Sequence, residues 1–165
     1  MSAGTGRRSQ VAVIGASGTQ EGEEAWALAE EVGRRLAEAG VVLVCGGGGG
    51  VMEAASRAAA EAGGTVIGIV PGESPVDANP YSTHVVATGI GHARNLAVVS
   101  SGEAVIAIGG EWGTLSEIGF ARVIGREVIA LRSWELDGRE RMRGGPGVVV
   151  VETAEEAIAA ALAGL

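Results

Sequence analysis

The stretch AVIAIGGEWGTLSEIGFARVI, residues 104–124, contains a candidate strand, a glycine turn and a candidate helix in direct succession. Residues 104–108 are continuously apolar, which is typical of strands covered on both faces of a parallel sheet. Glycines at 109, 110 and 113 turn the chain, and a helix is predicted over 114–124. A strand that leads through a short turn into a helix is the repeating unit of a doubly wound α/β sheet.

The same unit recurs on both sides of this stretch. Further Val/Ile-rich strands are predicted at 11–14, 41–44, 65–70, 84–87, 127–131 and 148–151, and helices at 23–39, 51–62, 92–101 and 153–162. Thr153 and Glu156 form a capping-box pattern at the start of the last helix. Because crossovers between parallel strands are right-handed, we expect a three-layer, doubly wound, mainly parallel sheet of about seven strands.

Composition indicates one acidic domain. The chain has 165 residues, of which 47% are hydrophobic, and its 12 basic and 20 acidic side chains give a net charge of −8. We expect a disordered leader over 1–9 and a single domain over 10–165. The negative charge disfavours nucleic acid as a partner. All basic residues are arginines, so the chain lacks the lysine that a pyridoxal-phosphate Schiff base or a GxxxxGK[ST] phosphate loop requires.

Few residues are available for metal or disulfide chemistry. Cys45 is the only cysteine, and His84 and His92 are the only histidines. An intramolecular disulfide is therefore impossible, and no metal site is predicted. No apolar run reaches the roughly 18 residues of a membrane span, and the N-terminus lacks a secretory h-region, so we expect a cytoplasmic protein without a membrane partner.

Three glycine-rich loops follow predicted strands, at Gly15–Gly18, Gly46–Gly50 and Gly109–Thr114. Each is expected to lead into a helix whose N-terminal amides favour an anion, and parallel strands place all three loops on one edge. A phosphate is the ligand that this arrangement suits. For Gly15–Gly18 alone, a tight turn without a ligand explains the pattern equally well. Residue 20 is Gln, so the dinucleotide pattern GxGxxG is not met.

Glu117 has two interpretations, and Arg94 bears on both. Glu117 follows Thr114 by three residues, so a capping box would explain the pair; alternatively, the carboxylate acts in a ligand site. Arg94, in GHARN at 91–95, lies near the start of a helix, where the helix dipole disfavours a cation. We therefore expect an anionic neighbour for Arg94, which is Glu117, a phosphorylated ligand or both.

GGEWGTLSE at 109–117 resembles the PGGxGTxxE signature of the LOG-like family, long labelled "lysine decarboxylase-like". GGGGGVMEAAS at 46–56 and GHARN are similar to two further segments of that family, and the resemblance covers about residues 11–131. It implies a Rossmann-like, usually oligomeric protein that cleaves the N-glycosidic bond of nucleoside 5′-monophosphates. The decarboxylase label finds no support in a chain without lysine.

The resemblance also implies roles for individual residues. Arg94 and Glu117 match the family's catalytic arginine and glutamate, whereas the residues that match its phosphate and neighbouring loops are Gly109, Gly110, Gly113, Thr114, Gly46, Gly47, Gly50 and Met52. Gly15, Ser17 and Gly18 of the first loop complete the predicted ligand site. No metal or cofactor is required.

At two positions the chain departs from the family's usual sequence and instead resembles a short bacterial branch of the family. Ile108 replaces the signature proline, and Asn95 stands where the hydrolases usually have lysine. That branch is also similar to molybdenum cofactor carrier proteins, which bind a phosphorylated pterin. Two alternative functions are therefore expected. One is a phosphoribohydrolase, in which Glu117 stabilises an oxocarbenium-like ribose and Arg94 holds the Glu117 carboxylate ionised; the other is a non-enzymatic carrier or sensor.

The remaining features leave alternatives open. We expect a homodimer or higher homo-oligomer, in which the Ala-rich helix 51–62 packs against a second copy. The Pro-rich segment 71–84 is either a lid or a packed surface loop. His92 is either a surface or capping residue or a proton donor to a leaving base. The basic cluster Arg132, Arg139, Arg141 and Arg143 indicates a solvated loop or a subunit contact.

Overall fold

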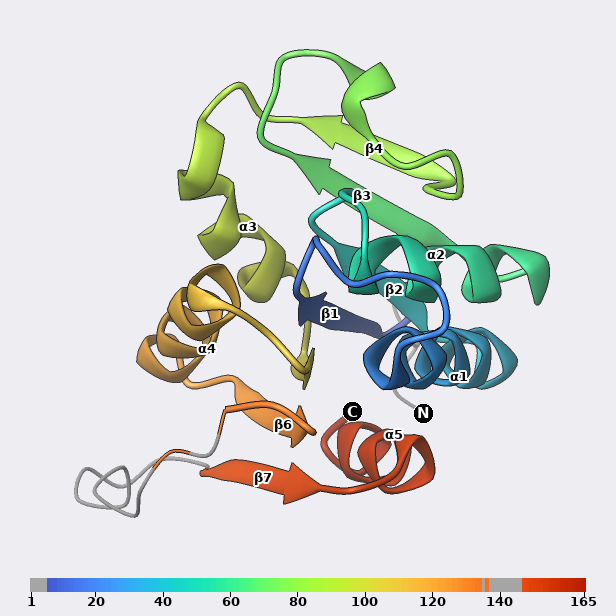
Figure 1. Cartoon of the computed structure of the whole chain (residues 1–165), viewed down its shortest axis with the longest axis vertical. Helices are drawn as coiled ribbons and strands as arrows, with labels where there is room; N and C mark the ends of the chain where they lie inside the picture. The colour runs from blue at the N-terminus through green and yellow to red at the C-terminus, as the bar shows by residue number, and fades with distance from the viewer. Residues whose placement is uncertain (1–5, 135, 137–146) are drawn as a thin grey trace.

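A computed structural model describes residues 6–134, 136 and 147–165. Within these residues, all strand pairs of the sheet are parallel, in the order β4-β3-β2-β1-β5-β6-β7 (Figure 1). The strands are β1 (Gln10–Gly15), β2 (Val42–Cys45), β3 (Val66–Val70), β4 (His84–Ala87), β5 (Ala104–Ile108), β6 (Glu127–Leu131) and β7 (Val148–Val151). The predicted seven-stranded, doubly wound parallel sheet is confirmed.

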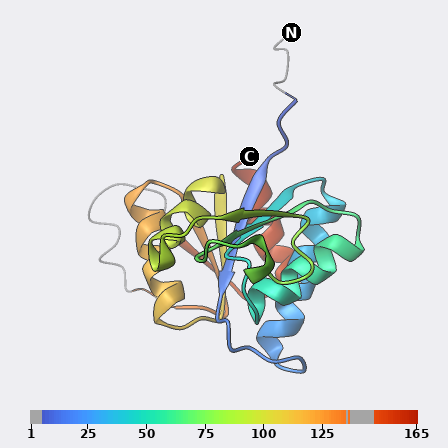
Figure 2. The same ribbon diagram turned by 90° about the horizontal axis from the view of Figure 1, so that it is seen from above.

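Helices cover both faces of the sheet, as the three-layer prediction requires (Figure 2). One face carries α1 (Glu24–Glu38), α2 (Val51–Glu61) and α5 (Ala154–Ala163), and the other carries α3 (Arg94–Ser101) and α4 (Trp112–Val123). Alternate residues of the central strands supply the two cores: Val11, Val13 and Ile106 face the first layer, and Ala12, Ile14 and Val105 face the second. The continuous apolar runs of β1 and β5 are thus explained by burial on both faces.

The prediction of two-sided burial is wrong for the outer strands. β4 and β7 form the two edges of the sheet, and Val86 of β4 and Val150 of β7 are each about half exposed. Valine-rich sequence alone does not distinguish an edge strand from a central one, because β-branched residues suit the extended backbone in both places.

The α1–α2 pair packs so closely that Gly33 can carry no side chain. A Cβ at Gly33 would overlap the carbonyl group of Ala55. The Arg57 guanidinium of α2 lies 5.4 Å from the ring centroid of Trp26 and forms an ion pair with Glu30. The buried alanines of helix 51–62 thus pack against α1 of the same chain, and a contact of this helix with a second copy stays a prediction.

The segment between β3 and β4 is packed rather than free, which favours the surface-loop interpretation over a lid. After the 3₁₀ helix η1 (Pro75–Asp77), the backbone N–H of Asn79 donates to the Gly47 carbonyl at 2.7 Å. The Asn79 side-chain amide also donates to the Gly48 carbonyl at 3.0 Å. This segment thus supports the second glycine loop.

At the chain ends, the structure bears on two further expectations. Residues 1–5 of the expected leader lie outside the described residues, whereas Ser9 accepts a hydrogen bond from the Val42 N–H at 2.9 Å. The Thr153–Glu156 capping box at the start of α5 is confirmed in both directions. None of the described helices has the length and apolar character that a bilayer crossing requires.

Candidate functional site

A cavity of about 140 Å³ opens at the carboxyl ends of β1 and β5. From β1 the strand order runs through β2 to β4 on one side and through β5 to β7 on the other (Figure 1). The cavity therefore lies at the topological switch point. Doubly wound sheets bind ligands at this point. The lining residues are Gly15, Ala16, Ser17, Met52, His92, Arg94, Asn95, Glu111, Gly113, Thr114 and Glu117.

The first two glycine loops meet behind this cavity. Gly50 has a φ of 62°, and a Cβ there would overlap the Ala16 carbonyl oxygen, which accepts a hydrogen bond from the Val51 N–H at 3.1 Å. The first loop is followed by a turn at residues 19–23, and α1 begins at Glu24, one residue later than predicted. α2, rather than α1, therefore points its N-terminus at this loop.

The third loop begins its helix two residues earlier than predicted. Gly109 and Gly110 have φ values of 55° and 126°, so the chain turns sharply and α4 begins at Trp112 with Glu111 as its N-cap. Thr114 is thus inside the first turn, and the predicted capping box with Glu117 is wrong. The Glu111 side chain makes no capping hydrogen bond to the helix.

Arg94 and Glu117 lie together in the cavity, which confirms that Arg94 has an anionic neighbour. Arg94 is the first residue of α3, after the 3₁₀ helix η2 (Gly91–Ala93). Its Nη1 lies 3.6 Å from Glu117 Oε1, and the two side chains are only 14% and 9% exposed. The guanidinium lies against Gly46, where a Cβ would be 2.7 Å from Cζ. The second loop therefore makes room for Arg94.

The charges of this pair are poorly compensated. Burial raises the pKa of Glu117 to about 7, although the Arg94 charge acts to lower it. Desolvation thus outweighs the effect of an ion pair at 3.6 Å, although Arg94 acts in the expected direction on the Glu117 carboxyl group. Arg94 Nε is also buried without a hydrogen-bond partner among the described residues. A buried guanidinium in this state favours a further anion.

Asn95 and Ser116 connect the two helices that carry this pair. The buried Asn95 side-chain amide donates to Ser116 Oγ at 3.5 Å, and Ser116 Oγ donates to the Gly113 carbonyl at 2.7 Å. Asn95 is thus placed to support the first turn of α4. Across the described residues, no cluster of three or more His, Cys, Asp or Glu side chains is close enough to hold a metal ion.

The structure divides the predicted site residues into three groups. Those that line the cavity are Gly15, Ser17, Met52, Arg94, Gly113, Thr114 and Glu117. Gly18, Gly46, Gly47 and Gly50 belong to the surrounding loops without lining it. Gly109 and Gly110 line a second cavity of about 390 Å³ together with Arg132, Ser133 and Trp134.

Sequence reasoning left Ala16, Asn95 and Glu111 out of the predicted ligand site, although all three line the first cavity. His92, for which a role as proton donor was left open, lines it as well. Ala16 and Glu111 stand within the glycine loops, and His92 and Asn95 flank Arg94, so position in the loops was the available signal. Of the predicted basic cluster, Arg132 forms ion pairs with Glu24 at 3.5 Å and Glu152 at 2.8 Å. Arg139, Arg141 and Arg143 lie outside the described residues.

Solved structures with this fold include molybdenum cofactor proteins. The chain is 31% identical to the molybdenum cofactor binding protein of Rippkaea orientalis, with a TM-score of 0.83 over 96% of this chain and 98% of that one. It is 29% identical to the molybdenum cofactor carrier protein of Chlamydomonas reinhardtii, with a TM-score of 0.80 over 93% and 96% of the two chains.

Sequence comparison extends the similarity over nearly the whole chain. A protein of Archaeoglobus fulgidus is 40% identical over 149 residues, which cover 90% of this chain and 91% of the relative. The SLOG cluster4 family matches residues 8–158. The chain therefore belongs to the SLOG cluster4 family, within the wider group that its LOG-like motifs indicated.

Proposed function

We propose that this protein binds a phosphorylated small molecule at the β1/β5 cavity and that its ligand is a pterin of the molybdenum cofactor type, held as cargo. The single observation that carries the proposal is the buried Arg94 guanidinium, whose described ion pair is a 3.6 Å contact with a carboxyl group of raised pKa. A phosphate in the cavity would supply a further negative charge beside this guanidinium.

The first turn of α4 supplies the remaining phosphate contacts in this proposal. Gly113 and Thr114 line the cavity, and no side chain of the N-cap residue competes for the helix-terminal amides. Helix N-termini favour anions through these amides and through the helix dipole. Ser17 lines the cavity as well and offers a hydroxyl group to the same phosphate.

The similarity to two molybdenum cofactor proteins supports the choice of a pterin over other phosphorylated molecules. The cavity volume of about 140 Å³ is compatible with a phosphate and the group next to it. Pockets that enclose a whole ligand are typically about 300–1,000 Å³, so the rest of the molecule extends beyond this cavity.

A second candidate function, phosphoribohydrolase activity, is favoured by one observation. A carboxyl group with a pKa of about 7 is present in both protonation states near neutral pH, as acid–base catalysis requires. In this reaction the C1′–N bond breaks, its electron pair stays with the base, and a proton from Glu117 neutralises that nitrogen. Water then bonds to C1′ and returns its proton to the carboxylate, giving free base and ribose 5-phosphate.

One experiment separates the two functions. Purified protein is incubated with a panel of nucleoside 5′-monophosphates while ribose 5-phosphate is measured, and in parallel it is titrated with molybdenum cofactor. Stoichiometric cofactor binding without ribose 5-phosphate supports the carrier, whereas catalytic release of ribose 5-phosphate supports the hydrolase. If the protein neither binds the cofactor nor releases ribose 5-phosphate, both proposals are contradicted.

We also propose that the protein forms a homo-oligomer through the outer face of α4. Phe120, Val123 and Ile124 are exposed there, and Val123 is 84% exposed. A chain with a net charge of −8 repels its own copies, so an uncharged apolar face is the part of the surface where association is favourable. Sedimentation should show a species larger than 16.4 kDa, and Val123→Glu should dissociate it. A monomer of the unmodified protein at micromolar concentration would contradict the proposal.

A further inference from the structure

The second cavity, at the carboxyl ends of β5 and β6, has no role in the function proposed above. It has a volume of about 390 Å³ and is lined by Gly109, Gly110, Arg132, Ser133 and Trp134. It is thus larger than the Arg94 cavity, and it lies on the other side of the Gly109–Glu111 loop. A volume in this range accommodates a small organic ring system.

The two cavities share no lining residue, but two contacts connect the chain segments that line them. On one side, Trp134 Nε1 donates to the Glu111 carbonyl at 3.3 Å, while the Glu111 residue lines the first cavity. On the other side, Ser17 lines the first cavity, and seven residues further along the chain Glu24 pairs at 3.5 Å with Arg132, which lines the second cavity. A ligand held in both cavities would cross the Gly109–Glu111 loop, which lies between them.

The charges indicate which end of a ligand each cavity takes. Arg132 is flanked by the carboxylates of Glu24 and Glu152, at 3.5 Å and 2.8 Å, so this group of three carries a net charge of −1. A phosphate is disfavoured beside it. The first cavity also holds a carboxylate besides Glu117, that of the α4 N-cap residue Glu111. Its cation, Arg94, is buried and lies 3.6 Å from Glu117, so it is less well compensated than Arg132, which lies 2.8 Å from Glu152. The phosphate thus belongs in the first cavity and a neutral group in the second.

The lining residues of the second cavity suit a flat, neutral ring. Gly109 and Gly110 present backbone without side chains, and the indole of Trp134 and the guanidinium of Arg132 are planar groups that stack on rings. Arg132 has a φ of 50°, a left-handed conformation that is uncommon for residues other than glycine. The Ser133 hydroxyl donates to the Gly109 carbonyl and fixes the neighbouring backbone.

Trp134 itself is held in place by a second tryptophan. The Trp112 and Trp134 ring centroids are 5.4 Å apart at an angle of 40°, although Trp112 is 77% exposed. The Trp134 ring is thus held by its contact with Trp112 and by its hydrogen bond to the Glu111 carbonyl. A side chain that is already held in this way loses little conformational entropy when a ligand stacks on it.

We infer that the second cavity binds the planar heterocycle of the ligand whose phosphate lies beside Arg94, and that Trp134 is the stacking residue that sets specificity for that ring. This inference rests on the proposed function in one respect, namely that the phosphate of the same ligand is bound beside Arg94. It assigns the heterocycle class: a neutral fused ring such as pterin or guanine, which share a 2-amino-4-oxopyrimidine edge.

The test compares three probes on the full chain by calorimetry: ribose 5-phosphate, guanosine 5′-monophosphate and free pterin. Stacking of a base on an aromatic side chain contributes roughly 5- to 150-fold in affinity. Trp134→Ala should therefore lower the affinity for guanosine 5′-monophosphate and for pterin at least fivefold. Its affinity for ribose 5-phosphate should stay within twofold of that of the unmodified protein. Trp134→Phe, which keeps an aromatic ring, should stay within about threefold for all probes.

The possible failures are distinguishable. If Trp134→Ala binds guanosine 5′-monophosphate as tightly as the unmodified protein does, the inference is overturned while the phosphate site stands. If ribose 5-phosphate fails to bind but pterin binds in a Trp134-dependent manner, the heterocycle site stands and the proposed phosphate anchor falls. If neither ring-bearing probe binds, the inference is overturned. Should Trp134→Ala not fold, Trp134→Leu replaces it: pterin affinity at least fivefold lower in Trp134→Leu than in Trp134→Phe supports stacking, and equal affinities overturn the inference.

Discussion

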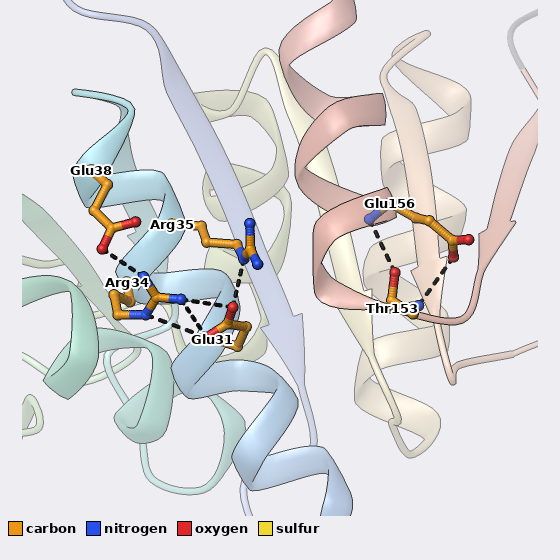
Figure 3. A network of polar contacts seen from close by, with 6 residues as sticks. All are labelled: Glu31, Arg34, Arg35, Glu38, Thr153 and Glu156. Carbon is orange, nitrogen blue, oxygen red and sulfur yellow. Dashed lines mark hydrogen bonds and ion pairs between the residues drawn. The ribbon is translucent and has the colours of Figure 1, made fainter.

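Two groups of arginine and glutamate side chains in this protein are built in opposite ways. On α1, Arg34 lies 2.7 Å from Glu31 and 2.6 Å from Glu38, and Arg35 lies 2.6 Å from Glu31, all at least one-third exposed (Figure 3). In the cavity, Arg94 and Glu117 are nearly buried and 3.6 Å apart. The exposed group is joined by close hydrogen bonds, and the buried pair is not.

The two carboxyl groups respond oppositely to these surroundings. Hydrogen bonds from Arg34 and Arg35 lower the pKa of Glu31, whereas burial raises the pKa of Glu117 to about 7. An exposed, well-formed network contributes little to stability, and a buried, loosely paired one lowers it unless a third group compensates the charges. The difference indicates that the first group belongs to the scaffold of α1 and the second to a ligand site.

Replacement of Glu117 should give the largest effect. Its pKa is 4.5 in ordinary surroundings and about 7 in the fold. Below pH 4.5 the group is neutral in both states; between pH 4.5 and 7 the unfolded chain ionises first, so folding stability falls as pH rises. Above pH 7 the loss reaches roughly 3 kcal/mol. Glu117→Gln removes this titration, so its stability relative to the unmodified protein should increase from pH 4 to pH 8.

Urea unfolding of both proteins at pH 4 and pH 8 measures this difference, and other titrating groups cancel in the comparison. Glu38→Gln, which removes an exposed carboxylate from the α1 network, is the matched control and should show no such pH-dependent gain. If Glu117→Gln and the unmodified protein lose stability in parallel over this range, the raised pKa of Glu117 is contradicted.

Arg94→Gln should weaken binding of ribose 5-phosphate by roughly 10- to 150-fold, since hydrogen bonds to a charged group contribute about 1.5–3 kcal/mol. Arg34→Gln removes the same charge from the chain but lies in the α1 network, so it should change the affinity less than twofold. Calorimetric titration of the three proteins provides the comparison. Equal losses in both variants would show that overall charge, rather than the Arg94 site, governs binding.

The capping box of α5 provides a smaller, purely structural effect. Thr153 Oγ1 accepts from the Glu156 N–H at 3.2 Å, and the Glu156 carboxylate accepts from the Thr153 N–H at 3.1 Å (Figure 3). Thr153→Ala should lower the free energy of unfolding by about 1 kcal/mol. Ribose 5-phosphate affinity should not change. A change in affinity above threefold would mean that α5 is coupled to the site.

The smallest effect is expected for the exposed network itself. Arg34→Gln should lower the free energy of unfolding by less than about 1 kcal/mol, because solvent screens ion pairs at the surface. Added salt should reduce this loss further. A loss above 2 kcal/mol in urea unfolding would show that the α1 network is structural in a way that its exposure does not suggest.

The arrangement of strands and helices could be predicted because apolar runs and helical periodicity are local signals. Residues 104–108 indicated a central strand, and β5 is central. The helix starts were less accessible: the sequence T-x-x-E fits a capping box both at Thr153 and at Thr114, yet only Thr153 caps its helix. The φ values of Gly109 and Gly110 decide the difference, and a sequence does not show them.

The part of the site that could be predicted also depended on local signals in the sequence. The dipole argument led to Arg94 and its anionic neighbour, because a cation at a helix start is visible in the sequence. Burial of Glu117 was not visible, since it depends on how α3 and α4 pack, and so the direction of its pKa shift was missed. The cavity beside Trp134 also depends on tertiary packing, because strands β5 and β6 bring Gly109 next to Ser133.

The most direct test of the phosphate site is the pattern of chemical-shift changes, of the backbone amides and of the Arg94 Nε–H, when ribose 5-phosphate is added to ¹⁵N-labelled protein. The account predicts the largest changes at Ser17, Gly113 and Thr114 and at the Arg94 side chain, with none along Glu31–Glu38 of α1. Saturable changes confined to residues outside the β1/β5 cavity, with Gly113 and Thr114 unmoved, would contradict it.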